Sequence, residues 1–200
     1  MKFMSAIALP NEEVIILISH GIGTPRRSLE SGKDEYRIDC DSFLDILDEV
    51  DAQVDVRLTF DDGNAADVHV ACRHSPSEVW RPAASSRPGG LGKPGSVDSD
   101  GVRALLARHM PIGTHGMSHR PWRGPTDSDR RVELVDARQA IAEACGATIN
   151  AGALPFGQYD HRGLAESRQL ECRAVYSSDV CRDEWGVVPA SVHRPCRGHA

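Results

Sequence analysis

The sequence predicts an α/β fold around a parallel sheet, because strand-like and helix-like segments alternate along most of its 200 residues. The strand-like segments are short, rich in β-branched residues and bounded by acids, Gly or Pro, whereas the helix-like segments carry apolar residues at helical spacing. Polar residues follow several of the strand-like segments. In barrels and in doubly wound sheets alike, sites form at the carboxyl ends of parallel strands, so these positions are where we expect function.

The first part of the chain predicts a strand, a helix and a second strand. Residues 14–21, VIILISHG, form a β-branched run of the length of a buried strand. Residues 40–50, CDSFLDILDEV, place apolar side chains on one face of a helix, with Asp41 or Ser42 as the N-cap. Residues 54–60, VDVRLTF, predict another strand, and two adjacent acids follow it directly.

The segment 71–95 breaks this alternation. It contains four prolines and no apolar pattern of strand or helix period. Each proline removes a backbone donor and restricts the residue before it. We therefore expect coil here, beside a sheet that is open or gapped.

The rest of the chain returns to the alternation. Residues 99–110 predict a helix, 111–116 a short strand running into a loop, and 127–146 a long helix that ends at a glycine. Residues 148–157 predict a strand that ends in a Pro-Phe-Gly turn, and 161–179 a helix followed by a strand.

Composition narrows the class of protein. The length suits one domain, 1–200, and the net charge of -6 with scattered Lys and Arg argues against a nucleic-acid-binding face. The six cysteines form no CxxC pair, which is typical of a reduced protein. No apolar run is long enough for a membrane span, and the N-terminal residues make a poor signal peptide, so we expect a cytoplasmic location.

Residues that could bind a metal ion or take part in catalysis follow four of the predicted strands. These carry His20, the pair Asp61 and Asp62, the pair His115 and His119, and the turn 154–157. Two histidines and one carboxylate are a standard ligand set for Zn²⁺ or another divalent ion, and a neighbouring acid can then act as a base. Taken alone, DDG is also a common solvated turn, and HxxxH is more often two surface histidines. The combination at successive strand ends indicates a metal site.

These residues resemble the motifs of the polysaccharide deacetylases, the NodB-homology family also called carbohydrate esterase family 4. TFDDG resembles the first motif, HGMSH the second, which is H-[ST]-x-x-H in many members, and ALPFGQYD the third. The resemblance covers roughly 14–70 and 92–180. It implies an irregular NodB-type (β/α) barrel, incomplete or gapped where residues 71–95 should supply a helix and a strand.

The resemblance also implies roles for individual residues. Asp62, His115 and His119 would bind one divalent metal ion, which is expected to be Zn²⁺, and Asp61 would be the catalytic base. The backbone N–H of Phe156 would stabilise the oxyanion.

Three further residues have a looser correspondence to the family. Asp179, in SSD, is a candidate for tuning the site, and His193, in SVH, is a candidate general acid. His20 is expected to support the site from behind the ligands and not to bind the metal.

The sequence departs from the family pattern at several places. The arginine of the third motif, which pairs with the catalytic acid in the family, falls at Ala153. The helix and strand that follow DDG in relatives are not visible. Reading plausible codons two nucleotides later restores Gly-Leu and Phe-Phe, so residues from about 71 to 90 are hypothesised to be frameshifted, with a loop insertion as the alternative. Residues 181–200 read as an irregular tail.

The predicted function is metal-dependent hydrolysis of a carbon–nitrogen bond, with N-deacetylation of an N-acetylated sugar or polysaccharide as the expected reaction. One alternative keeps the fold and the metal but takes a cyclic amide as the substrate. The other is an impaired family member that binds metal or glycan without turnover, as Ala153 and residues 71–95 would favour.

Overall fold

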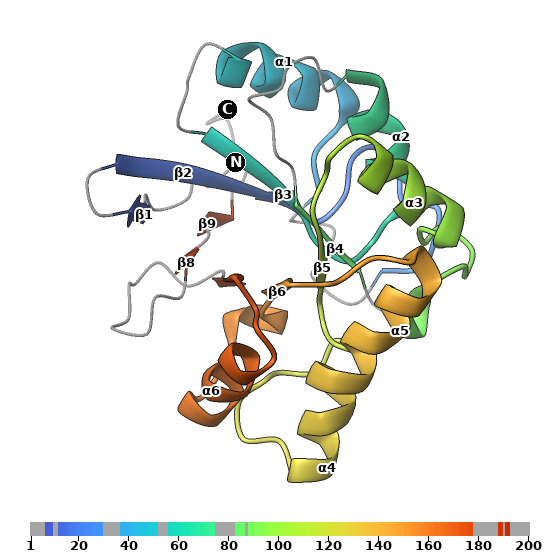
Figure 1. The fold of residues 1–200 in the computed structure, drawn as a ribbon. Helices are drawn as coiled ribbons and strands as arrows, with labels where there is room; N and C mark the ends of the chain where they lie inside the picture. Colours follow the sequence, from blue (N-terminus) through green and yellow to red (C-terminus); the bar gives the residue numbers. More distant parts are fainter. Residues whose placement is uncertain are drawn as a thin grey trace.

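The computed structural model of the chain describes residues 7–9, 12–29, 37–51, 56–74, 83–86, 88–177, 188–189 and 191–192. Within these ranges nine strands form one sheet in the order β1-β2-β3-β4-β5-β6-β7-β8, and β9 pairs with β2. The helices form an arc around this sheet (Figure 1). The α/β class that the alternating pattern predicts is confirmed.

The strands are short apart from β2. They are β1 (Ile7–Leu9), β2 (Glu12–Ser19), β3 (Val56–Phe60), β4 (Ala83–Ser86), β5 (Ile112–Thr114), β6 (Ala151–Ala153), β7 (Ala174–Ser177), β8 (Val188–Pro189) and β9 (Ser191–Val192). The pair β1 and β2 is antiparallel, and all other described pairs are parallel. The carboxyl ends of β2 to β7 therefore meet at one edge of the sheet.

The helices follow the predicted segments closely, with one addition. They are α1 (Cys40–Asp51), α2 (Ala65–His74), α3 (Ser99–Ala107), α4 (Asp127–Arg130), α5 (Ala137–Cys145) and α6 (His161–Gln169). A π-helical segment, η3 (Arg131–Asp136), joins α4 to α5, and Gly146 ends α5 with a left-handed φ of 71°. The added helix is α2, which the sequence pattern did not predict. No helix in the described ranges is long and apolar enough to cross a membrane.

The expectation of coil throughout 71–95 is wrong for the described residues. Helix α2 continues to His74, and β4 pairs in parallel with β3 and with β5. Two of the prolines, Pro82 and Pro88, flank β4 in the sequence and do not interrupt it. The sequence Ala-Ala-Ser-Ser shows no strand pattern, so the unpaired backbone groups of β3 and β5 decide its conformation. The frameshift hypothesis loses this structural support and remains a question about the coding DNA.

The barrel is incomplete, as the family resemblance implies, but its opening lies between β8 and β9 and not at residues 71–95. The two-residue strand β8 pairs with β7. Strand β9 begins at residue 191 and pairs with β2, the second strand at the other end of the sheet order. No pairing between β8 and β9 is described, so backbone hydrogen bonds do not close the ring within the described ranges. These four residues correct the expectation of an irregular tail from 181 to 200.

The main core lies between the sheet and helices α1, α3 and α5. Its buried side chains include Phe43, Leu47, Leu58, Phe60, Val102, Leu105, Ile112, Ile141 and Ile149. A second cluster under η3 and α6 contains Trp122, Leu134, Leu154 and Leu164. The first cluster includes Leu58 and Phe60 of β3 and Ile112 of β5, the two strands that precede the candidate site residues.

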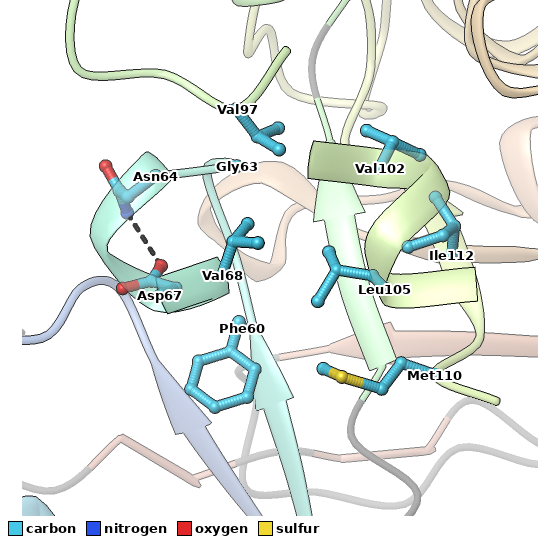
Figure 2. Close-up of a pocket in the computed structure, with 10 residues that line it drawn as sticks. All are labelled: Phe60, Gly63, Asn64, Asp67, Val68, Val97, Val102, Leu105, Met110 and Ile112. Atoms are coloured by element: carbon cyan, nitrogen blue, oxygen red, sulfur yellow. Dashed lines mark hydrogen bonds between the residues drawn. The ribbon is translucent and has the colours of Figure 1, made fainter. Parts of the chain in front are cut away.

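A small cavity lies between α2, α3 and the ends of β3 and β5 (Figure 2). Its volume is about 20 Å³, and most of its lining is aliphatic or aromatic. Asn64 and Asp67 are hydrogen-bonded to each other at its edge. A space of this size holds about one water molecule, so it is a packing defect and not a ligand pocket.

Candidate metal centre

The acids of the first motif occupy a strained turn directly after β3. Asp62 has φ of 71° and Gly63 has φ of 58°, so two successive residues are left-handed. Both carboxylates are buried, with residue exposures of 4% for Asp61 and 3% for Asp62. The N–H of Asp61 donates to the carbonyl oxygen of Ser19, at 2.9 Å, and this bond ties the turn to the end of β2.

Asn64 and Arg27 hold the turn from the side. Asn64 Nδ2 donates to the carbonyl oxygen of His20 at 3.0 Å and to Asp67 Oδ2 at 3.1 Å. Arg27 Nη2 donates to Asn64 Oδ1 at 2.7 Å and to the carbonyl oxygen of Asp62 at 3.3 Å. The left-handed backbone of Asp62 is therefore held directly by the Arg27 side chain, and Asn64 ties the same turn to His20 and Asp67.

His115 follows β5 and presents one ring nitrogen to the site. Its Nδ1 lies 2.9 Å from the carbonyl oxygen of Ala153 on β6, and this assigns the proton to Nδ1. Nε2 is buried without a hydrogen-bond partner and lies 3.8 Å from Asp62 Oδ1. Burial lowers the pKa of His115 to about 3, against the opposing effect of the Asp62 carboxylate. The neutral imidazole with a free lone pair is the form that binds metal ions.

His119 comes to the same point from the other end of the HGMSH loop. Its Nε2 lies 3.7 Å from Asp62 Oδ1, and its ring centroid lies 4.8 Å from that of His115. One ligand atom from each of Asp62, His115 and His119 lies within 4.8 Å of the others. Contacts of 3.7–3.8 Å are too long for hydrogen bonds. They are close to the separation of about 3.3–3.6 Å expected between ligands of a tetrahedral ion with bonds of about 2.0–2.2 Å. The donor set fits a divalent cation.

The comparisons with known proteins agree with this geometry. Residues 48–175 match the family model described as polysaccharide deacetylase. The chain belongs to the polysaccharide deacetylase family. Its members are hydrolytic enzymes, and the first two family motifs coincide with the cluster of Asp62, His115 and His119. No curated protein matches the chain.

Solved structures of polysaccharide deacetylases share the fold at low sequence identity. A Bacillus anthracis protein described as a polysaccharide deacetylase matches with a TM-score of 0.68 and 14% identity, over 89% of this chain and 64% of that one. A Streptococcus pyogenes deacetylase determined with acetate matches with a TM-score of 0.67 and 14% identity, over 83% and 84% of the two chains. A de-N-acetylase from Aggregatibacter actinomycetemcomitans matches with a TM-score of 0.70 and 12% identity, over 92% and 96%. The chain thus spans just under two thirds of the first of these proteins.

The third motif of this deacetylase-family chain borders the metal centre. Phe156 lies in the turn Pro155–Gly157 with φ of 58°, and its side chain is exposed (53%). Its ring centroid is 4.3 Å from that of His119, so the ring forms one wall beside the ligands. Ala153 has no side chain to reach Asp61 as the family arginine would, and its carbonyl oxygen contacts His115 instead.

The remaining candidates of the family motifs are not members of the ligand cluster or lie beyond the described ranges. His20 is half-buried at the end of β2 and is not part of the three-residue cluster. Its carbonyl oxygen accepts from Asn64. Asp179 and His193 lie outside the described residues.

Two buried carboxylates near this candidate metal centre could not be identified from the sequence. Asp67 on α2 accepts from the N–H of Ile22 at 2.9 Å, and burial raises its pKa to about 7. Glu133 on η3 accepts from two backbone N–H groups of the HGMSH loop. Neither belongs to a motif, and each contacts residues far away in the chain, so spacing alone could not have found them.

Proposed function

We propose that the chain is a metal-dependent N-deacetylase that hydrolyses the amide of an N-acetylated sugar or polysaccharide. The observation that carries this proposal is the convergence of Asp62, His115 and His119 at the carboxyl ends of parallel strands in a polysaccharide deacetylase fold. The neutral state of His115 and its unpartnered Nε2 support a metal site over a hydrogen-bonded cluster.

Asp62, His115 and His119 would hold the ion, which we propose to be Zn²⁺ because His and carboxylate ligands suit it. When bound, the ion would polarise the amide carbonyl and lower the pKa of the attacking water towards about 7. His115 is kept in the correct tautomer by the carbonyl oxygen of Ala153, which aims Nε2 at the ion.

Asp61 would take the proton of the attacking water. It directly precedes the ligand Asp62, it is buried, and the hydrogen bond from its N–H to Ser19 keeps its backbone in place. The backbone N–H of Phe156 would donate to the developing oxyanion, and its exposed ring would cover one side of the acetyl group. His193 as the general acid and Asp179 as a tuning residue remain proposals from the family motifs.

Ala153 favours a second candidate, an impaired family member that binds metal or glycan and turns over slowly. The family arginine would orient the catalytic acid and stabilise its charge. Without it, Asp61 depends on the backbone and on its nearest buried neighbours. The chain would then keep the metal centre and lose most of its rate of amide hydrolysis.

The test begins with purified full-length protein loaded with Zn²⁺. We expect about one Zn²⁺ per chain and acetate release from N-acetylglucosamine oligomers. Zn²⁺ binding with no acetate release from these oligomers would support the impaired member, and release of product from cyclic amides alone would support the cyclic-amide reading. Absence of stoichiometric Zn²⁺, Co²⁺ or Mn²⁺ binding would overturn the proposal.

A further inference from the structure

The HGMSH loop, residues 115–119, rests on a buried carboxylate. Glu133 is only 2% exposed, and its Oε2 accepts from the N–H of Met117 at 2.9 Å and from that of Ser118 at 3.2 Å. Its Oε1 also lies 3.2 Å from the Ser118 nitrogen. These two N–H groups belong to the residues immediately before His119. The carboxylate therefore binds the backbone of the short connection between the two histidines.

Gly116 makes room for this carboxylate. It has φ of 77°, and a Cβ placed there would lie 2.3 Å from Glu133 Oε2. Real Cβ atoms do not approach an oxygen so closely, so any other residue at 116 would have to push the carboxylate away. In the motif pattern H-[ST]-x-x-H this position carries a hydroxyl side chain. Here the oxygen of Glu133 fills the space that such a side chain would take.

The contacts of Glu133 indicate that it fixes the conformation of the HGMSH loop. Among the described residues no cation pairs with it, although isolated buried carboxylates are costly. Its hydrogen bonds go to the loop instead, in the way that a phosphate or carboxylate is held by successive backbone N–H groups. The indole Nε1 of Trp122, buried without a hydrogen-bond partner, lies 3.4 Å from the same Cβ position of Gly116.

The location of Glu133 also supports a role in fixing the conformation of the HGMSH loop. It lies in the π-helical segment Arg131–Asp136, and such segments occur frequently at functional sites. The loop that it holds places His119 at φ of 60°, with Nε2 3.7 Å from Asp62 Oδ1. A left-handed residue of this kind persists only where its surroundings impose it.

We propose that Glu133 is a positioning residue of the metal centre, which replaces the motif hydroxyl and requires Gly116 as its partner. It acts through the backbone of Met117 and Ser118 on the orientation of His119, without touching the metal or the substrate. The inference rests on the metal site of the proposed function.

The experiment compares Glu133→Ala, Glu133→Gln, Gly116→Ser and the double variant Gly116→Ser/Glu133→Ala with the parent. Glu143→Gln is the matched control, because Glu143 is an exposed glutamate on the adjoining helix α5. Zn²⁺ affinity is measured by competition with a chelator, and hydrogen exchange of the Met117 and Ser118 amides is measured in the metal-free protein. Circular dichroism checks that each variant is folded.

We expect Glu133→Ala to weaken Zn²⁺ binding by about 10–100-fold and to speed exchange of both amides. Glu133→Gln keeps one acceptor oxygen and should fall between Glu133→Ala and the parent. Gly116→Ser should also weaken binding, because it displaces the carboxylate. In the double variant there is no carboxylate for the serine side chain to clash with. Its fold-loss of Zn²⁺ affinity should therefore be clearly smaller than the product of the fold-losses of the two single variants.

The metal-free measurement separates this inference from the proposed function. If the parent binds no Zn²⁺, the proposed function fails, whereas amide exchange still tests the grip of Glu133 on the loop. Unchanged Met117 and Ser118 exchange in Glu133→Ala overturns the inference, and so does an equal loss of Zn²⁺ affinity in Glu143→Gln. If Glu133→Ala does not fold, Glu133→Gln and Gly116→Ser carry the same test, and parent-like exchange in both overturns it.

Discussion

Asp62 combines a left-handed backbone, with φ of 71°, and a buried carboxylate that both histidines approach. Such a conformation costs on the order of 1–3 kcal/mol and is typical of functional sites. Asn64 and Arg27 maintain it through hydrogen bonds to the turn and its neighbours. Of the two adjacent acids, only Asp62 belongs to the cluster of candidate ligands, so we expect different effects when each is changed.

Asp61→Asn should leave Zn²⁺ binding intact and lower acetate release by about 10²–10⁴-fold, because it removes a proton acceptor and no ligand. His115→Ala should lose both Zn²⁺ binding and acetate release, because Nε2 is one of the three proposed ligand atoms. Metal content by elemental analysis and acetate release from the same preparations check the pair. An Asp61→Asn variant that hydrolyses at the parent rate would remove Asp61 from the mechanism.

Asp67 should make the stability of the metal-free protein depend on pH. Its pKa rises from 3.8 to about 7 on folding, so between these values the folded state holds a proton that the unfolded state has released. Its contribution to the free energy of unfolding therefore falls as pH rises from about 4 to 7, by at most a few kcal/mol. His115 acts in the opposite direction, because its pKa falls to about 3 and its contribution is lost as pH drops below about 6.5.

The contribution of Asp67 to the free energy of unfolding is isolated by comparing the pH profile of the parent with that of Asp67→Asn. The unfolding free energy of the parent minus that of Asp67→Asn should decrease as pH rises from 4 to 7 in the presence of a chelator. Urea titrations at four or five pH values measure it. A difference that stays constant across this range would contradict the raised pKa.

At the scale of elements, β4 decides whether the sheet is continuous. Its four residues lie between β3 and β5, and the register pairs Ala84 with Phe60 on one side and with Ile112 on the other. Without it, the backbone groups of both neighbours would be buried and unpaired. A strand with so little apolar pattern of its own is held mainly by this ladder.

Ala84→Pro should therefore destabilise the protein by on the order of 1–3 kcal/mol or more, because proline removes a ladder donor in a strand that is paired on both sides. Ser99→Pro is the matched control: it places proline at the first residue of α3, after the extended N-cap Asp98, where proline is tolerated. Thermal and urea unfolding compare the two. Equal stability of Ala84→Pro and the parent would mean that β4 does not pair in solution.

At the scale of the whole molecule, the metal centre joins segments that are distant in sequence. Asp62 follows β3 and the two histidines follow β5, with α2, β4 and α3 between them in the chain. An ion bound by all three residues would connect the ends of these strands across the sheet. Metal binding and folding should therefore be coupled.

Saturating Zn²⁺ should raise the thermal midpoint of the parent, by an amount that corresponds to about 2.7 kcal/mol at one hundred times the dissociation constant. A chelator should reverse the shift, and His115→Ala should show none. Differential scanning calorimetry with and without Zn²⁺ measures both. A shift of equal size in His115→Ala would place the stabilising ion elsewhere.

The sequence by itself determined the α/β class, the family and the candidate ligand set. Asp62, His115 and His119 follow predicted parallel strands whose ends must meet at one edge. The tertiary structure decided what these local patterns could not contain. Residues 83–86 become a strand because β3 and β5 offer unpaired backbone groups, although their own sequence shows no strand pattern. Likewise, Glu133 reaches the loop that carries the candidate ligands only because η3 packs under the HGMSH loop beside a glycine. Such contacts join residues that are distant in the chain, and their energies depend on burial and geometry that arise only when the chain is folded.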